Sequence, residues 1–228
     1  DRIVAEISSF QLETVADFRP HIALILNIAE DHLDRHKTLE NYIAAKYRIF
    51  ENQGSDNYLI LNRDDDNLSK LQVTGGIRVF YFSRTKKMSE GIWVDGGYIW
   101  MNIGNGAVPI CKTEQIGIPG SHNLENALAA ALAAGLSGVN TEVIANVLKE
   151  FPGVEHRIER VGTINGITFY NDSKGTNPKS SIKAIEAMQG PTILIAGGMD
   201  KKSSFYELMD AFGDKIKELV LLGETANK

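Results

Sequence analysis

Lys46 combines a charged side chain with a position on an apolar helix face. Between Thr38 and Phe50 the apolar residues recur at helical spacing, and Lys46 falls among them. The apolar positions are Leu39, Tyr42, Ile43, Ile49 and Phe50. Desolvation of an ammonium group favours its neutral form, and a neutral amine is a nucleophile. The alternative is that the lysine lays its methylene groups along the apolar face and reaches water at the rim.

A short run of acids and histidines lies upstream of this lysine. Its members are Glu30, Asp31, His32, Asp34 and His36. They follow the continuous apolar run 22–28, which is typical of a strand buried on both faces. Ligands bind at the carboxyl ends of strands in open α/β sheets, and carboxylates with an imidazole suit Mg2+. The run and Lys46 together favour a metal site, whereas the run alone could be a solvated turn with Asp34 or Thr38 capping the next helix.

Glu6 is an acid within another apolar run. Residues 2–7 predict a strand with Glu6 near its carboxyl end, followed directly by Ser8. An acid in such a run needs a partner, and a metal ion or a cation would serve.

Short strings connect these residues with a known family. They are EISSFQL at 6–12, NIAEDHLD at 27–34, AKYRIF at 45–50 and NDSKGTNP at 171–178. In this combination and order they resemble the Mur ligases of peptidoglycan synthesis. EISSFQL and NDSKGTNP favour the members that add D-glutamate to UDP-N-acetylmuramoyl-L-alanine. The resemblance implies the α/β fold of a central ATP-binding domain at 1–152, with a mostly parallel sheet and a small antiparallel β portion. A partial Rossmann-like, glutamate-binding domain would follow at 153–228.

The resemblance also implies a role for the candidate metal residues. Lys46 matches a lysine that CO2 carbamylates, which turns a cation into a carboxylate able to reach Mg2+. Glu6 and His32 match the other protein ligands of this ion, and Asp31 lies beside them in the sequence. Lys46, His32 and Asp31, with Lys174, are therefore the expected catalytic residues.

Further matches imply where ATP and the substrates bind. Asn123, Asn126 and Arg157 match residues that hold the adenine and phosphates of ATP. Asp172 matches a ribose-binding residue, and Lys174 matches one near the transferred phosphate. Ser8, Thr176 and Lys201 match substrate-binding positions. In the implied reaction ATP phosphorylates the alanine carboxylate, and the amine of D-glutamate attacks the acyl phosphate. Without the resemblance, Asp172, Lys174 and Lys201 could equally form a solvated loop edge.

Composition narrows the class of protein. The chain has 228 residues, of which 43% are hydrophobic, enough for one large or two medium domains. A net charge of −5 offers no basic face for nucleic acid. The single cysteine, Cys111, excludes an internal disulfide framework and suits a reducing compartment. Apolar runs stay short of the roughly 18 residues of a membrane helix. We therefore expect a monomer in the cytoplasm, with no nucleic-acid partner and no membrane insertion.

The periodic pattern predicts alternating elements in the first part of the chain. Strands are expected at about 2–7, 22–29, 57–61 and 77–82, and helices at about 38–52 and 65–71. Turn signals between 91 and 111 predict short antiparallel strands. Helices are expected at 121–136 and from Thr141, and the break at 151–153 marks the domain boundary.

The second part predicts a βαβαβ unit. Strands are expected at 166–171, 192–196 and 216–222. Asn177 and Pro178 predict the start of one helix, and Ser204 with Glu207 predicts a capping box for the next.

The sequence contains no GxxxxGK[ST] phosphate loop, although the resembled ligases depend on one. The resemblance therefore implies an internal portion of a ligase, without the N-terminal UDP-binding domain, the phosphate loop and the C-terminal end, and inactive alone.

Two other classes of protein fit parts of the pattern. A metal-dependent hydrolase with a carbamylated lysine would need more than the five histidines present. A non-catalytic nucleotide-binding or scaffold protein would explain the missing loop. Folylpolyglutamate synthase also carries such a lysine, but its strings after the first strand differ.

Overall fold

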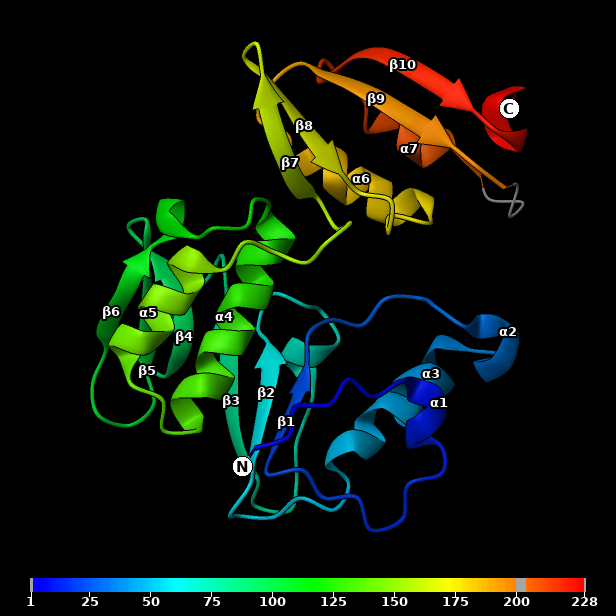
Figure 1. Ribbon diagram of the computed structural model, residues 1–228. Coiled ribbons are helices and arrows are strands. Elements are labelled where there is room, and N and C mark those ends of the chain that lie inside the picture. Colours follow the sequence, from blue (N-terminus) through cyan, green and yellow to red (C-terminus); the bar gives the residue numbers. More distant parts are fainter. Residues whose placement is uncertain (1, 200–203, 228) are drawn as a thin grey trace. The chain divides into compact units, whose positions relative to one another are not determined.

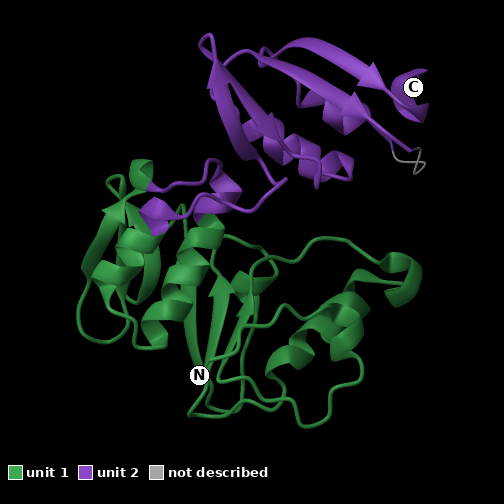
Figure 2. Cartoon of the chain, in the orientation of Figure 1, with its two compact units in different colours: residues 1–115, 125–147 green, residues 116–124, 148–228 purple. Residues whose placement is uncertain are grey.

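The computed structural model describes residues 2–199 and 204–227. The chain divides into two compact units, residues 1–115 with 125–147 and residues 116–124 with 148–228 (Figure 2). Each unit has its own secondary structure, and each is described by itself below.

The first unit contains a six-stranded sheet in which the strands follow one another in sequence order (Figure 1). The strands are β1 (Ile22–Ile25), β2 (Tyr58–Asn62), β3 (Arg78–Ser83), β4 (Gly91–Asp95), β5 (Tyr98–Asn102) and β6 (Val108–Lys112). Neighbours from β1 to β4 are parallel, and β4, β5 and β6 pair antiparallel. The mostly parallel sheet with a small antiparallel portion is confirmed.

The core of the sheet rests on β2. Leu59, Ile60 and Leu61 are completely buried, and alternation along a strand sends Ile60 to the face opposite the other two. Leu59 and Leu61 belong to a cluster with Ala23 of β1, against which Ile43 and further apolar side chains of 39–50 pack. β2 is therefore buried on both faces, as expected for a strand inside a parallel sheet.

Helix α3 (Leu39–Tyr47) and a 3-10 turn (Arg48–Phe50) confirm the helix expected at 38–52. Thr38 caps α3, since its hydroxyl accepts a hydrogen bond from the Asn41 amide at 3.3 Å. Two further helices, α4 (Ser121–Leu136) and α5 (Thr141–Glu150), also agree with the sequence pattern. Gly135 of α4 lies against Met101 of β5, where a Cβ atom would come within 2.9 Å of the sulfur. None of the helices in the described part of the chain is long and apolar enough to cross a bilayer.

The strand predicted at 2–7 is wrong. Residues 2–7 form no regular element, and Ile3 and Val4 are 94% and 99% exposed. A strand needs a neighbour to satisfy its backbone groups, and no strand in the described residues pairs with this segment. The chain instead turns at Ser8 into the short helix α1 (Ser9–Leu12).

Two other predicted elements are shorter than expected. The strand predicted at 22–29 ends at Ile25. The helix predicted at 65–71 is only a 3-10 turn at Leu68–Lys70, because the Asp65 carboxylate accepts hydrogen bonds from the amides of Asn67 and Leu68 and holds a tight turn.

The second unit contains two separate two-stranded sheets. One is an antiparallel hairpin of β7 (Glu159–Ile164) and β8 (Ile167–Asn171), and the other pairs β9 (Thr192–Gly197) with β10 (Ile216–Leu222) in parallel. Helices α6 (Pro178–Ala187) and α7 (Tyr206–Asp210) lie along the β9–β10 pair (Figure 1). Lys215, just before β10, donates to the carbonyl of Glu186 in α6 at 2.7 Å.

The strand β7 was missed, and this changes the expected βαβαβ unit. β8 pairs with β7 and not with β9. Asn165 and Gly166 form the turn between them with φ of 52° and 79°, which is the Asn-Gly hairpin signal that should have predicted β7. The capping box at Ser204 and Glu207 is also wrong, because α7 begins at Tyr206 with Phe205 as its N-cap and no side-chain cap bond.

Candidate functional site

Three short helices position two of the expected metal ligands, His32 and Lys46, and the expected substrate-binding residue Ser8. Ser8 caps α1, His32 is the N-cap of α2 (Leu33–His36), and Lys46 lies in the last turn of α3. Both α1 and α2 contact α3, so the three helices form one layer (Figure 1). The layer brings α1 together with α2 and α3, which follow more than 20 residues later in the sequence.

Side chains from β2 and the turn after it hold the segment that leads to His32. The Asn62 amide donates to the carbonyl of Leu26 at 3.0 Å, and the Asp65 carboxylate accepts from the Ile28 amide at 2.9 Å. These bonds satisfy backbone groups that β1 leaves unpaired when it ends. The sequence reasoning missed both residues, although a run of polar side chains directly after a buried strand was the available signal.

Asp31 and His32 meet at the start of α2. His32 has a left-handed backbone with φ of 53°, and its amide donates to Asp31 Oδ1 at 2.9 Å. Asp31 Oδ2 lies 3.6 Å from the imidazole Nε2. The carboxylate thus lies beside the ring, where it can orient the imidazole.

Lys46 is half-buried, and its amine lies 5.2 Å from the centre of the Tyr42 ring. An ammonium at this distance is attracted by the ring face. The neighbouring Tyr47 is buried enough that its hydroxyl pKa is raised, with the Asp65 charge acting in the same direction.

Glu6 is exposed in the irregular segment before α1. Among residues 2–199 and 204–227, no group of three or more histidine, cysteine and acidic side chains is placed to hold a metal ion. Glu6 and His32 offer one carboxylate and one imidazole, so a third ligand would have to come from elsewhere. A carbamate on Lys46 would be an oxygen ligand of the kind that Mg2+ prefers.

Hydrogen bonds donated by backbone amides join the loop of the second unit that carries Arg157 to the loop that follows β8. The Ile158 amide donates to Asp172 Oδ1 at 3.0 Å, and the Lys174 amide donates to the carbonyl of His156 at 3.0 Å. Gly175 fits because a Cβ atom there would lie 2.4 Å from Asp172 Oδ2. The structure therefore brings together the backbone positions of Arg157, Asp172 and Lys174.

The remaining sequence-predicted residues have simpler surroundings. Asn123 in the first turn of α4 donates to the carbonyl of Pro119 at 2.6 Å. Asn126 and Thr176 are exposed. Lys201 lies outside the described residues.

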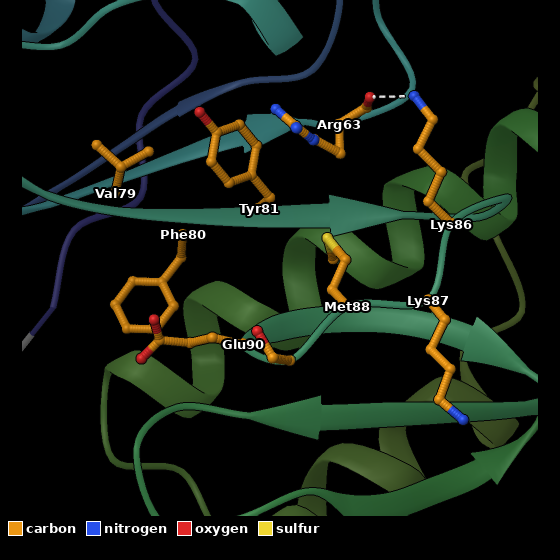
Figure 3. Close-up of a pocket in the computed structure, with 9 residues that line it drawn as sticks. Arg63, Val79, Phe80, Tyr81, Lys86, Lys87, Met88 and Glu90 are labelled. Carbon is orange, nitrogen blue, oxygen red and sulfur yellow. Dashed lines mark hydrogen bonds between the residues drawn. The ribbon is translucent and has the colours of Figure 1, made fainter.

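A cavity of about 600 Å3 in the first unit is lined by none of the predicted site residues. Its lining includes Arg63, Lys86 and Lys87, yet their charged groups do not converge (Figure 3). The Lys86 amine donates to the carbonyl of Arg63 at 2.9 Å, and the Lys87 amine points away toward Asp95, 2.6 Å from Oδ2. We assign no anion site to this cavity.

Comparison with known families accounts for the layout of the chain. Residues 1–134 match the Mur ligase middle domain, and residues 156–228 match the Mur ligase glutamate ligase domain. The chain belongs to the Mur ligase family. The resemblance that the short strings suggested is therefore confirmed.

Curated relatives match this chain along nearly its whole length. Two proteins named UDP-N-acetylmuramoylalanine--D-glutamate ligase, from Thermoanaerobacter sp. (strain X514) and Clostridioides difficile (strain 630), are 56% and 47% identical to this chain. The matches cover 100% and 99% of this chain and 50% of each relative. The chain thus spans about half the length of the curated relatives it matches.

Solved structures show the same fold. MurF from Acinetobacter baumannii has a TM-score of 0.67 at 19% identity, over 95% of this chain and 49% of that one. MurF ligase from Thermotoga maritima in complex with ADP has a TM-score of 0.61 at 17% identity, over 89% of this chain and 52% of that one. A mutant of L. casei FPGS reaches a TM-score of 0.60 at 15% identity, over 89% of this chain and 50% of that one. These neighbours confirm the Mur ligase architecture.

Proposed function

We propose that this chain acts in the ATP-dependent joining of D-glutamate to UDP-N-acetylmuramoyl-L-alanine, through an acyl phosphate, in peptidoglycan biosynthesis. The observation that carries the proposal is 56% identity along the entire chain with a relative named for that reaction. The domain boundary at 152/153 is part of the proposal, and the two family matches, which end at 134 and start at 156, are consistent with it.

The joined loops of the second unit supply the proposed nucleotide site. Arg157 and Lys174 would stabilise the negative charge that develops on phosphate oxygens. Stabilisation of this charge is a main part of catalysis in phosphoryl transfer. Asp172 would bind the ribose, while its Oδ1 accepts from the Ile158 amide and keeps the two loops together. Asn123 and Asn126 would bind the adenine and phosphates from α4.

The helical layer of the first unit supplies the proposed metal site. Glu6, His32 and a carbamate on Lys46 would hold Mg2+, and Asp31 would orient the His32 ring. These donors fit a hard cation, because carboxylate oxygens are the preferred ligands of Mg2+. When bound, the ion neutralises charge on the transferred phosphoryl group.

Substrate binding and cellular role complete the proposal. Ser8, Thr176 and Lys201 would contact the substrates, with Ser8 held at the start of α1 by its capping box with Gln11. We place the protein in the cytoplasm as a monomer that contributes to cell wall biogenesis, cell shape and cell division.

Product analysis tests the function directly. The protein expressed from its native gene is incubated with ATP, Mg2+, UDP-N-acetylmuramoyl-L-alanine and one amino acid from a panel, and the products are identified by mass spectrometry. We expect one adduct, with D-glutamate, and an equal amount of phosphate. Nucleotide binding without any adduct would instead support the non-catalytic protein. An adduct only when a folate replaces the muramoyl substrate would favour a folylpolyglutamate synthase.

A further inference from the structure

A chain of three polar side chains runs through the helical layer. His36 at the end of α2 places Nε2 3.0 Å from the hydroxyl of Ser9 in α1, and Nδ1 lies 3.4 Å from Glu13 Oε1. Ser9 and His36 are 4% and 6% exposed. Polar groups are buried this deeply only when they are paired, so the contacts fix the two helices to each other.

Phe10 connects these three side chains to His32, the proposed metal ligand. Its ring stacks on the His36 ring with centroids 5.6 Å apart and planes 7° apart, and it lies 4.8 Å from the His32 ring. The Arg35 guanidinium is 5.2 Å from the centre of the same ring. A change in the orientation of the His36 ring would therefore shift Phe10, and through Phe10 the His32 ring.

Arg35 keeps the Glu13 carboxylate in its charged form. Its guanidinium donates to the Glu13 carboxylate at 2.5 Å, and this bond lowers the pKa of Glu13 against the opposing effect of burial. Glu13 is thus an anion at neutral pH. A carboxylate facing Nδ1 favours the tautomer with the proton on that nitrogen, which leaves Nε2 as an acceptor for the Ser9 hydroxyl.

The order of serine, histidine and acid also occurs in hydrolases, where the serine is a nucleophile. Such a serine needs access for a substrate and donors for an oxyanion. Ser9 is buried inside the layer, so access is lacking. A positioning role fits these contacts better than a nucleophilic one.

We propose that Glu13, His36 and Ser9 form a relay, buried at Ser9 and His36, that positions the candidate site. The relay holds the turn with Ser8 against α2 and, through Phe10, fixes the orientation of the His32 imidazole. This inference rests on the proposed function for its catalytic meaning, whereas the relay itself can be observed without any activity.

The first test is spectroscopic and uses the full 228-residue chain. The 15N shifts of the His36 ring report which nitrogen carries the proton. We expect a protonated Nδ1 and an unprotonated Nε2 in the wild type, and a mixture of tautomers in Glu13→Gln. A proton on Nε2 in the wild type would overturn the relay, because the Ser9 hydroxyl could not then donate to that nitrogen.

The second test uses Ser9→Ala in the protein expressed from its native gene. We expect the Mg2+ concentration for half-maximal rate to rise about 10- to 100-fold, the usual effect of removing a group that orients a metal ligand. Ser83→Ala is the matched control, since Ser83 is also buried and donates its hydroxyl to a charged side chain, Asp64, at 2.7 Å. Its Mg2+ dependence should stay unchanged even if both variants lose similar stability.

The outcomes separate the relay from the proposed function. Unchanged Mg2+ dependence in Ser9→Ala would overturn the relay, as would ester hydrolysis by the wild type that Ser9→Ala abolishes. If the wild type makes no D-glutamate adduct, the proposed function fails. In that case the relay is tested by the His36 tautomer and by the NMR shifts of the His32 ring in Ser9→Ala. His32 shifts that do not change in this variant would refute the relay.

Discussion

At the scale of single residues, Lys46 has an aromatic ring beside its amine. Its amine lies over the Tyr42 ring, and the face of an aromatic ring attracts a cation but not an anion. Conversion to a carbamate would give up this attraction. A bound cation would have to offset the loss, so carbamylation and Mg2+ binding should be coupled.

The first prediction follows from this coupling. We expect Lys46→Ala to abolish adduct formation in the protein expressed from its native gene, and Mg2+ to increase the amount of carbamate that forms from 13C-bicarbonate, measured by NMR. Lys112→Ala is the control, since the Lys112 amine also lies over an aromatic ring, 5.9 Å from the centre of Tyr98. Full rates for Lys46→Ala, or near-normal rates of the wild type in bicarbonate-free buffer, would exclude the carbamate from catalysis.

The pKa of Asp64 is lowered because the effect of its hydrogen-bond partners exceeds the opposing effect of burial. Burial raises its pKa, but hydrogen bonds from the hydroxyls of Thr85 and Ser83 and the amides of Arg84 and Thr85 lower it below the ordinary 3.8. A lowered folded-state pKa stabilises the protein above the unfolded value, and this contribution is lost as the pH falls through the folded pKa.

The second prediction concerns acid unfolding. We expect Asp64→Asn to lower the thermal midpoint at pH 7 and to weaken its dependence on pH below about 4, where the carboxyl of the unfolded chain takes up a proton. Exposed Asp66 gives the control, Asp66→Asn. The same acid dependence in wild type and Asp64→Asn would show that the four bonds do not favour the charged form.

At the scale of elements, the sequence predicted best where a local signal and the tertiary environment agree. Asn177 caps α6 as expected, and Thr38, one of the two residues considered as a cap, caps α3, because the cap bonds are local. The strand at 2–7 failed because its apolar pattern has no neighbouring strand, a fact that lies outside the segment itself. The candidate site shows the same limit. Residue types suggested Lys46 and His32 as candidates, whereas the contact between Ser9 and His36 joins residues 27 positions apart and has no local signal.

The third prediction tests the cap of α6. Asn177 accepts from the Ser180 amide at 2.8 Å, and the Ser180 hydroxyl lies 3.3 Å from the Asn177 amide nitrogen, which completes a capping box. We expect Asn177→Ala to cost about 1 kcal/mol in the free energy of unfolding, measured by urea titration. Asn177→Asp keeps the acceptor and should cost less. Equal losses in both variants would mean that the side-chain oxygen is not what stabilises this helix start.

At the scale of the molecule, the two units differ in how deeply their strands are buried. Leu59, Ile60 and Leu61 of β2 are 0% exposed, whereas Ile195 of β9 is 67% and Val161 of β7 is 64% exposed. Apolar burial is the main source of stability. We therefore expect the first unit to open less often than the second.

The fourth prediction makes this difference measurable. Leu61→Ala removes a completely buried side chain and should cost the first unit about 2 to 5 kcal/mol. Ile195→Ala, in an exposed strand position, should cost less than about 0.5 kcal/mol. Hydrogen exchange followed by mass spectrometry in low urea would report each unit separately, with β2 amides losing protection in Leu61→Ala while β9 and β10 amides keep theirs. If β9 and β10 lose protection equally, the two units unfold together, since independent units would confine the cost of a cavity to the one that contains it.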